Sequence, residues 1–215
     1  VLVSGRGTNL EALLGAHHRG ELPIEFRAVI SNRPEAPALE RARAHGIATA
    51  VLDHKAYPDR AGFDADLAAC IDRYRPALVI LAGFMRILTD AFIERYRDRL
   101  MNIHPSLLPD FRGLHTHRRA LEAGVACHGA TVHFVTAELD GGPPVLQATV
   151  AVHADDDAER LAARVLEREH RIFPLAVRWF AEGRLTFDGV TARLDGAELA
   201  APIVDPPELE HETAL

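Results

Sequence analysis

Apolar and polar residues alternate along the first half of the chain in blocks whose spacing changes between that of a strand and that of a helix. Short apolar runs are separated by longer stretches in which apolar residues recur every three or four positions, as on one helix face. This order predicts a parallel sheet with helices between its strands. The first expected strand ends at Val3, and the others cover residues 26–30, 49–52, 77–82 and 100–103. The first expected helix follows the turn at 4–7, and the others cover residues 38–45, 63–74 and 90–96.

Local features refine these elements. The run from Ala77 to Ala82 has no polar residue on either face, which predicts a central strand covered on both sides. Gly46 follows the second helix at the position that favours a left-handed residue, and Pro76 halts the third helix. The expected buried faces are Leu10, Leu13, Leu14 and His17 in the first helix, and Phe63, Leu67, Cys70, Ile71 and Tyr74 in the third.

The second half of the chain predicts antiparallel strands and one long helix. Residues 130–135 and 145–152 have strand character and flank the turn Asp140-Gly141-Gly142-Pro143. A long helix over 158–180, interrupted at Pro174, and a small hairpin around Asp195-Gly196 follow. The predicted fold class is therefore α/β: a mostly parallel, twisted, Rossmann-like sheet with helices on both faces and antiparallel additions in the C-terminal half.

The length of the chain favours one domain. A chain of 215 residues can bury one large core, so we expect a single domain over 1–200, with halves at 1–100 and 101–200. Residues 201–215 are acidic and contain proline, which predicts a mobile tail. Neither a heptad repeat nor a large apolar stripe stands out, which leaves the oligomeric state open. Our expectation is a monomer or a weak homodimer.

Charge and cysteine content exclude several classes of protein. The net charge of −7 argues against a protein that holds nucleic acid through its phosphates. Cys70, expected in the core, and Cys127, expected in a loop, form no CxxC pair and fit a reducing, cytoplasmic location. Apolar runs fall far short of the roughly 20 residues that a membrane helix needs, so we expect no membrane contact.

The segment Ser4-Gly5-Arg6-Gly7-Thr8-Asn9 joins a strand to a helix and is a candidate anion site. Glycines let the backbone approach an anion closely, and the exposed amides at the helix start attract phosphate. The segment lacks the Gly-Lys-Ser/Thr of a Walker loop and the third glycine of a dinucleotide fingerprint. A tight turn with a helix cap is the alternative interpretation.

Asn102 and His104 stand at the end of a predicted strand, where ligands bind in open α/β sheets. Strand alternation puts both side chains on one side, where an amide and an imidazole can stabilise an oxyanion or move a proton. If Asp140 approaches His104, its charge favours the imidazolium. The alternatives are a loop locked by Pro105 and Pro109, and ordinary turn chemistry at Asp140.

Four histidines, His104, His115, His117 and His128, raise the question of a metal. Imidazole is a common zinc ligand. However, these spacings match none of the compact zinc motifs, and neither cysteine is placed to help. We therefore expect no required metal.

Five segments stand out, at residues 5–9, 82–88, 102–109, 113–117 and 140–143. Taken together, they resemble the folate-dependent formyltransferases of purine biosynthesis. The resemblance runs in order from the first residue to about Gly183. It departs from the family where Thr8 stands in place of a common Ser and Leu166 in place of a polar Gln. The segments are Gly-Arg-Gly-Thr-Asn at 5–9, Ala-Gly-Phe-Met-Arg-Ile-Leu at 82–88, Asn-Ile-His-Pro-Ser-Leu-Leu-Pro at 102–109, Gly-Leu-His-Thr-His at 113–117 and Asp-Gly-Gly-Pro at 140–143.

The resemblance implies a formyl transfer from 10-formyltetrahydrofolate to the amine of glycinamide ribonucleotide, with no metal. It implies a ribonucleotide-phosphate half over 1–100 and a catalytic and folate half over 101–200. The implied catalytic residues are Asn102, His104 and Asp140. The implied ribonucleotide ligands are Gly7, Thr8, Asn9 and Glu169, and the implied folate ligands are Arg60, Met85, Arg86, Ile87, Leu88 and Asn102.

Three other functions stay open. The same trio can hydrolyse formyltetrahydrofolate with water as the nucleophile, as in the related deformylases, which carry an extra regulatory domain. A related enzyme formylates methionyl-tRNA and carries an additional nucleic-acid-binding domain. A module that binds nucleotides without catalysis is the third alternative, against which the presence of Asn102, His104 and Asp140 speaks.

Overall fold

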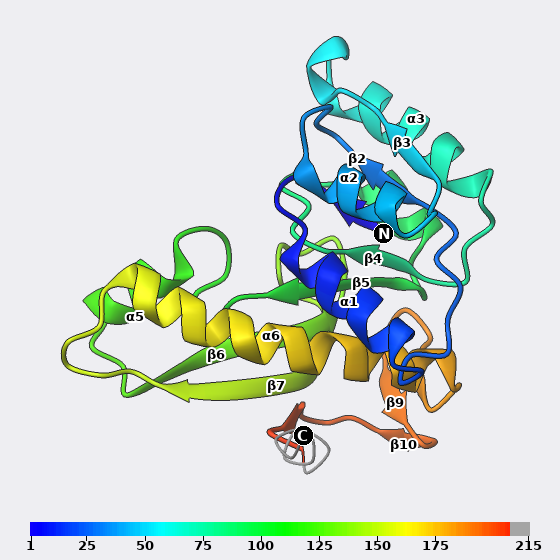
Figure 1. Ribbon diagram of the computed structural model, residues 1–215. Helices are drawn as coiled ribbons and strands as arrows, with labels where there is room; N and C mark the ends of the chain where they lie inside the picture. The colour runs from blue at the N-terminus through cyan, green and yellow to red at the C-terminus, as the bar shows by residue number, and fades with distance from the viewer. Residues whose placement is uncertain (207–215) are drawn as a thin grey trace.

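The computed structural model describes residues 1–206 and contains a sheet of eight strands flanked by helices (Figure 1). The strand order is β11-β7-β6-β5-β4-β1-β2-β3. Neighbours from β3 to β5 are parallel, β6 is antiparallel to β5 and β7, and β11 is parallel to β7, which confirms the predicted fold class. The strands are β1 (Leu2–Val3), β2 (Val29–Ser31), β3 (Thr49–Val51), β4 (Val79–Leu81), β5 (Leu100–His104), β6 (Cys127–Phe134), β7 (Pro144–Ala151) and β11 (Ile203–Val204).

Helices cover both faces of this sheet and enclose two separate cores. Ile80 of β4 packs into one core, whereas Val79 and Leu81 pack into the other. The expected central strand is thus confirmed, since alternate side chains of β4 are buried on opposite faces. The first core includes residues of α1 (Thr8–His18), α2 (Pro37–Ala44), α5 (Thr116–Glu122) and α6 (Ala158–Ala181); the second includes residues of α3 (Arg60–Asp72) and α4 (Asp90–Arg95).

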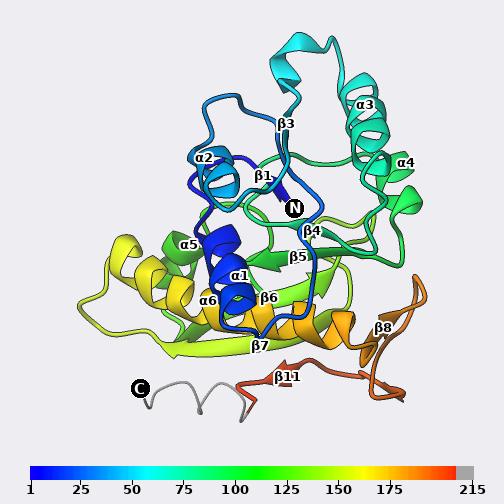
Figure 2. The same ribbon diagram turned by 45° about the vertical axis from the view of Figure 1, so that its right-hand side comes forward.

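Helix α6 is the longest element and packs beside α1 (Figures 1 and 2). The predicted interruption at Pro174 is wrong, because the helix continues through this residue for 24 residues in all. An interior proline removes one backbone hydrogen bond and costs about 3 kcal/mol. Phe173, Leu175 and Ala176 are buried around Pro174, and this packing offsets the lost bond.

Several expected boundaries move by a few residues. β2 begins at Val29 rather than at residue 26, and α3 ends at Asp72, which leaves Tyr74 beyond the helix. His17 is exposed, because Ala16 supplies the buried position beside Leu13 and Leu14. The structure also contains the helix α5 and a 3-10 turn, η1 (His54–Ala56), that the sequence pattern did not predict.

One expectation about the second half needs correction, and three other expectations are confirmed. Cys127 belongs to β6 rather than to a loop, because its pairing with β7 extends to this residue. Cys70 is buried as expected, and Gly46 has the expected positive φ of 69°. The hairpin around Asp195-Gly196 is present within a three-stranded antiparallel sheet of β8 (Leu185–Phe187), β9 (Ala192–Leu194) and β10 (Ala197–Glu198).

The predicted tail begins too early. Ile203 and Val204 form β11 and pair with Leu146 and Gln147 at the edge of the main sheet. Asp205 holds this edge by accepting hydrogen bonds from the amide and hydroxyl of Thr149. The rest of the predicted tail, residues 207–215, lies outside the described residues. The division of the chain into two functional halves stays a prediction.

Candidate active site

The carboxyl end of β5 carries two of the polar side chains that the sequence singled out. Asn102 and His104 alternate with buried Ile103 and therefore point to the same side of the sheet. On the antiparallel neighbour β6, His133 lies opposite Asn102 and Thr131 lies opposite His104. Only 6% of His104 is exposed. Four polar side chains therefore face one another where β5 ends.

Asp140 reaches His104 from the turn between β6 and β7. Its Oδ2 lies 3.5 Å from His104 Nδ1 and accepts a hydrogen bond of 2.9 Å from the Gly113 amide. The other ring nitrogen, Nε2, lies 3.1 Å from the carbonyl oxygen of Phe111. Because both ring nitrogens face oxygen acceptors, the doubly protonated imidazolium can donate to both. The structure thus brings Asn102, His104 and Asp140 together.

The turn that carries Asp140 also has a strict steric demand. Asp140 has a left-handed φ of 48°. A Cβ on Gly142 would lie 1.9 Å from the carbonyl oxygen of Phe134, so this position excludes any side chain. The same segment, residues 140–143, therefore forms the tight turn and brings Asp140 to His104.

His133 is a site residue that the sequence analysis treated only as part of the strand before Asp140. Burial lowers the pKa of His133 to about 4, despite the hydrogen bond to Phe134 and the charge of Asp140, which oppose this shift. Its Nδ1 donates to the Phe134 carbonyl at 2.9 Å, so the unprotonated Nε2 accepts from Asn102 Nδ2 at 3.1 Å. His133 thereby orients the Asn102 amide. Strand alternation could have indicated which side of β6 His133 faces. It does not show that His133 lies opposite Asn102, which requires knowing that β6 pairs with β5.

The loop before α1 presents backbone amides toward the same edge of the sheet. Gly7 caps α1 with a φ of 75°, and Thr8 is the first helical residue. A Cβ on Gly7 would lie 2.5 Å from the Cβ of Ala38, so only glycine fits without a shift of α2. Since Gly7 has no side chain to cap the helix, its first amides are open to an anion.

Asn9 and Glu169 meet although 160 residues separate them. Asn9 Nδ2 donates to Glu169 Oε2 at 2.6 Å. Burial raises the pKa of Glu169, and the hydrogen bond from Asn9 opposes this shift. The contact joins the start of α1 to the middle of α6, so the carboxyl group of Glu169 lies beside the candidate anion loop, residues 4–9.

The segment after β4 forms the other side of the site. β4 pairs with β5 through Leu81 and Asn102, so the residues that follow β4 lie at the same edge of the sheet. Met85 and Ile87 are 62% and 59% exposed, whereas Leu88 is buried. The exposed pair offers an apolar surface of the kind that a planar ligand requires.

Two arginines accompany this segment. The guanidinium of Arg86 lies 5.6 Å from the centre of the Phe63 ring, which fits a cation–π contact. Arg60 is exposed at the first position of α3. Both are candidates to meet a negatively charged ligand.

The histidine-rich stretch forms a ring cluster. The rings of His117 and His128 lie 5.3 Å apart at a right angle, and burial lowers the pKa of both, that of His128 to about 4. His115 is exposed before α5. Within residues 1–206, no three His, Cys, Asp or Glu side chains are arranged to hold a metal ion. Among the helices of that range, none is long and apolar enough to cross a membrane.

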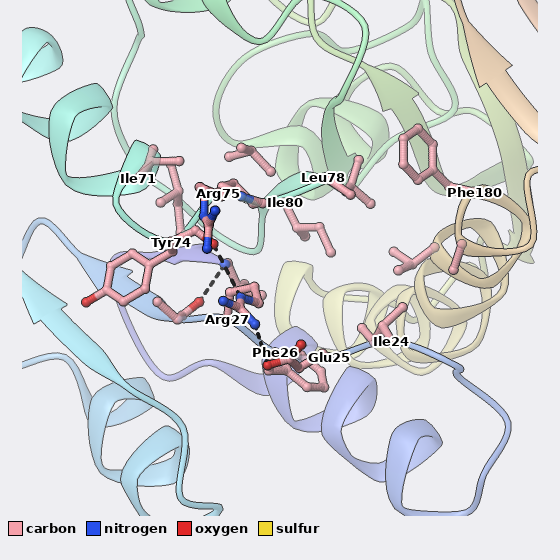
Figure 3. Close-up of a pocket in the computed structure, with 18 of the residues that line it drawn as sticks. Ile24, Glu25, Phe26, Arg27, Ile71, Tyr74, Arg75, Leu78, Ile80 and Phe180 are labelled. Atoms are coloured by element: carbon pink, nitrogen blue, oxygen red, sulfur yellow. Dashed lines mark hydrogen bonds and ion pairs between the residues drawn. The ribbon is translucent and has the colours of Figure 1, made fainter.

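A cavity of about 490 Å³ lies at the opposite, amino ends of β1, β2 and β4 (Figure 3). Its walls are mainly apolar, with Ile24, Leu78 and Phe180 among them. Arg27 crosses it and donates to the Tyr74 carbonyl at 3.3 Å. None of its lining residues belongs to the predicted site, and ligands of open α/β sheets bind at the carboxyl ends instead.

Comparisons with known proteins identify the family of this chain. Residues 1–177 match the formyl transferase family. The chain is 52% identical over 199 residues to phosphoribosylglycinamide formyltransferase of Escherichia coli, covering 93% of this chain and 94% of that protein. It is similar, with a TM-score of 0.91 and 48% identity, to the structure of the Coxiella burnetii phosphoribosylglycinamide formyltransferase, covering 95% of this chain and 97% of that one. The chain therefore belongs to the formyl transferase family, within its phosphoribosylglycinamide formyltransferase branch.

Proposed function

We propose that this enzyme transfers the formyl group of 10-formyltetrahydrofolate to the amine of glycinamide ribonucleotide. The products are N-formylglycinamide ribonucleotide and tetrahydrofolate, in the biosynthesis of purines. The juxtaposition of Asn102, His104 and Asp140, at the same edge of the sheet as the 4–9 loop and the apolar segment after β4, carries this proposal. The Escherichia coli relative bears the name of this activity and matches along nearly its whole length.

The two ligands are assigned to the loops that follow β1 and β4. The phosphate of the ribonucleotide binds the amides of Gly7, Thr8 and Asn9, and Glu169 binds the sugar portion. The folate binds Arg60, the segment Met85, Arg86, Ile87 and Leu88, and Asn102. Because this folate segment precedes residue 100, the folate would span both proposed halves of the domain.

The proposed chemistry is direct acyl transfer. The amine attacks the formyl carbon, and the carbonyl electron pair moves to the oxygen. Nδ2 of Asn102 spends one N–H on His133 and can donate the other to this oxyanion, beside the His104 imidazolium. The bond to the folate nitrogen then breaks as the oxyanion collapses, and that nitrogen takes a proton lost by the amine. Asp140 orients the His104 ring through Nδ1 and assists this proton transfer through a water.

The trio supplies every group that this reaction needs, so we propose no metal and no covalent enzyme intermediate. We also propose a cytoplasmic enzyme that acts as a monomer or weak homodimer on these two small molecules, without nucleic acid or membrane partners.

The test is to incubate the protein with 10-formyltetrahydrofolate alone, with glycinamide ribonucleotide, or with methionyl-tRNA. We expect tetrahydrofolate to form only with the ribonucleotide, together with a formylated product detected by mass spectrometry. Release of formate without an amine would identify a hydrolase, and formylation of the tRNA a different transferase. No turnover in any mixture would identify a binding module.

A further inference from the structure

The segment 83–89, which carries the proposed folate ligands, is fastened at both of its ends. At the first end, the amide of Ser4 donates to the Gly83 carbonyl at 3.2 Å, and the amide of Met85 donates to Ser4 Oγ at 2.7 Å. Ser4 Oγ in turn donates to Asn32 Oδ1 at 2.5 Å. Because the single hydroxyl proton is used on Asn32, the oxygen is left to accept from Met85.

At the second end, a buried carboxylate holds the backbone. Asp64 Oδ2 accepts from the Thr89 amide at 2.6 Å, and only 3% of Asp64 is exposed. Thr89 also caps α4, since its Oγ1 accepts from the Phe92 amide. The bond from Asp64 thus fixes where the segment stops and where α4 starts.

Burying Asp64 at this position lowers the stability of the protein. Its Oδ1 has no hydrogen-bond partner among the described residues. An unpaired buried carboxylate oxygen loses its hydration, and an apolar side chain of similar size would fill the space at lower cost. What the carboxylate supplies, and an apolar residue cannot, is the acceptor for Thr89.

The first turn of α3 supports the same segment from below. Phe63 lies under the guanidinium of Arg86, and Arg60 precedes Phe63 by three residues and Asp64 by four in the same helix. Between the two fastened ends, Met85 and Ile87 remain exposed. The two ends therefore determine how these apolar side chains and the backbone groups around them are presented.

We propose that Ser4 and Asp64 are positioning residues for the folate cosubstrate: together they set the shape of the 85–88 segment that binds it. This inference rests on the proposed function. Ser4 also opens the anion loop, so one side chain ties the two proposed ligand segments together. Neither residue touches the reacting atoms, so their loss acts on folate affinity rather than on the chemical step.

The test uses Asp64→Ala, Asp64→Asn and Ser4→Ala with steady-state kinetics on both substrates. Removing a hydrogen bond to a charged acceptor costs about a factor of ten or more in binding, so Asp64→Ala should raise the KM for 10-formyltetrahydrofolate at least about tenfold. Ser4→Ala should shift it the same way. For Asp64→Ala, the KM for glycinamide ribonucleotide and kcat should change less than about threefold. Asp64→Asn keeps an acceptor and should recover most of the loss.

Two matched controls separate positioning from general damage. Asp72→Ala removes another carboxylate of α3, one that accepts from Tyr96. Ser31→Ala removes a buried hydroxyl of the neighbouring strand end, which bonds only to Arg33 among the described residues. Neither should move the folate KM. Equal rises in both KM values of Asp64→Ala, a fall in kcat alone, or an Asp64→Asn variant as weak as Asp64→Ala would overturn the proposal.

A binding measurement keeps this inference separate from the proposed function. Calorimetric titration with tetrahydrofolate reports folate affinity without turnover, and we expect the same loss in Asp64→Ala and Ser4→Ala. If the unaltered protein binds tetrahydrofolate but transfers no formyl group, the proposed function fails and the titration still decides the roles of Ser4 and Asp64. If transfer proceeds and both variants bind as well as the unaltered protein, only the positioning role fails. If Asp64→Ala does not fold, Asp64→Asn and Ser4→Ala decide whether the positioning role is correct.

Discussion

At the proposed phosphate end of the site, the groups expected to face the ligand are backbone amides of one short loop, whereas at the proposed catalytic end they are side chains from β5, β6 and the 140–143 turn. The first end depends on shape, since Gly7 must adopt a φ of 75° and leave room for Ala38. The second depends on topology, since Asn102 meets His133 only because β6 runs beside β5. The conformation of the 4–9 loop depends on a few neighbouring residues, whereas the pairing of β5 with β6 depends on the whole fold.

The largest effect should follow from removing a side chain at the catalytic end. His104→Ala or Asn102→Ala should lower kcat by about 10²–10³, because Asn102 is the proposed donor to the oxyanion and His104 the proposed cation beside it. The KM for the ribonucleotide should change little, which single-turnover and steady-state assays can measure. His153→Ala, beyond the far end of β7, is the control. Near-normal turnover in His104→Ala would remove this residue from the mechanism.

The phosphate end should respond through its backbone. Gly7→Ala forces a side chain into a left-handed position and against Ala38, so it should destabilise the protein by about 2 kcal/mol and raise the ribonucleotide KM about tenfold or more. Gly20→Ala is the matched control, since Gly20 has a φ of 76° but nothing within 4 Å of an added Cβ. Urea unfolding and KM measurements should show a smaller destabilisation and an unchanged KM for Gly20→Ala. Equal behaviour of the two variants would mean that the contact with α2 is unimportant.

The catalytic end should also be the more sensitive to acid. Burial lowers the pKa of His128 to about 4 in the folded chain, whereas an unfolded histidine titrates near 6.5. Between these values the unfolded state binds the additional proton, so the free energy of unfolding falls as the pH is lowered from about 6.5 to 4. His128→Phe should reduce this loss by about 1 kcal/mol at pH 5. Urea midpoints at pH 7, 6 and 5 test it, and an unchanged pH dependence would contradict it.

The smallest effect is expected at the sheet edge, away from both ends. Asp205→Ala removes the two bonds that hold β11 to Thr149 and should lower Tm by about 2 °C. Catalysis should be unaffected, because β11 contacts β7 and not the proposed cleft. Scanning calorimetry and the formyl-transfer assay measure the two quantities. A fall in kcat would show that the edge strand is coupled to the site.

What could be predicted from the sequence follows from the same contrast. The strand pattern placed Asn102 and His104 on one side, and the glycines marked the anion loop, because both are local properties. His133 was missed because its importance depends on strand pairing. The two residues of β11 are too few to carry a strand pattern, and burial overrode the local rule at Pro174. Asn9 and Glu169, 160 residues apart, were joined only by the family resemblance.

β6 enters the catalytic end in the direction opposite to β5 and is hydrogen-bonded to a strand on each side. Residues 131 and 133 are therefore held within the sheet rather than in a loop. Exchanging them alters the surroundings of Asn102 without changing loop lengths or the conformation at Gly7. For engineering the enzyme toward another amine acceptor, β6 is thus a rigid strand on which side chains can be varied one at a time. The proposed phosphate site at Gly7, Thr8 and Asn9 would be left unchanged.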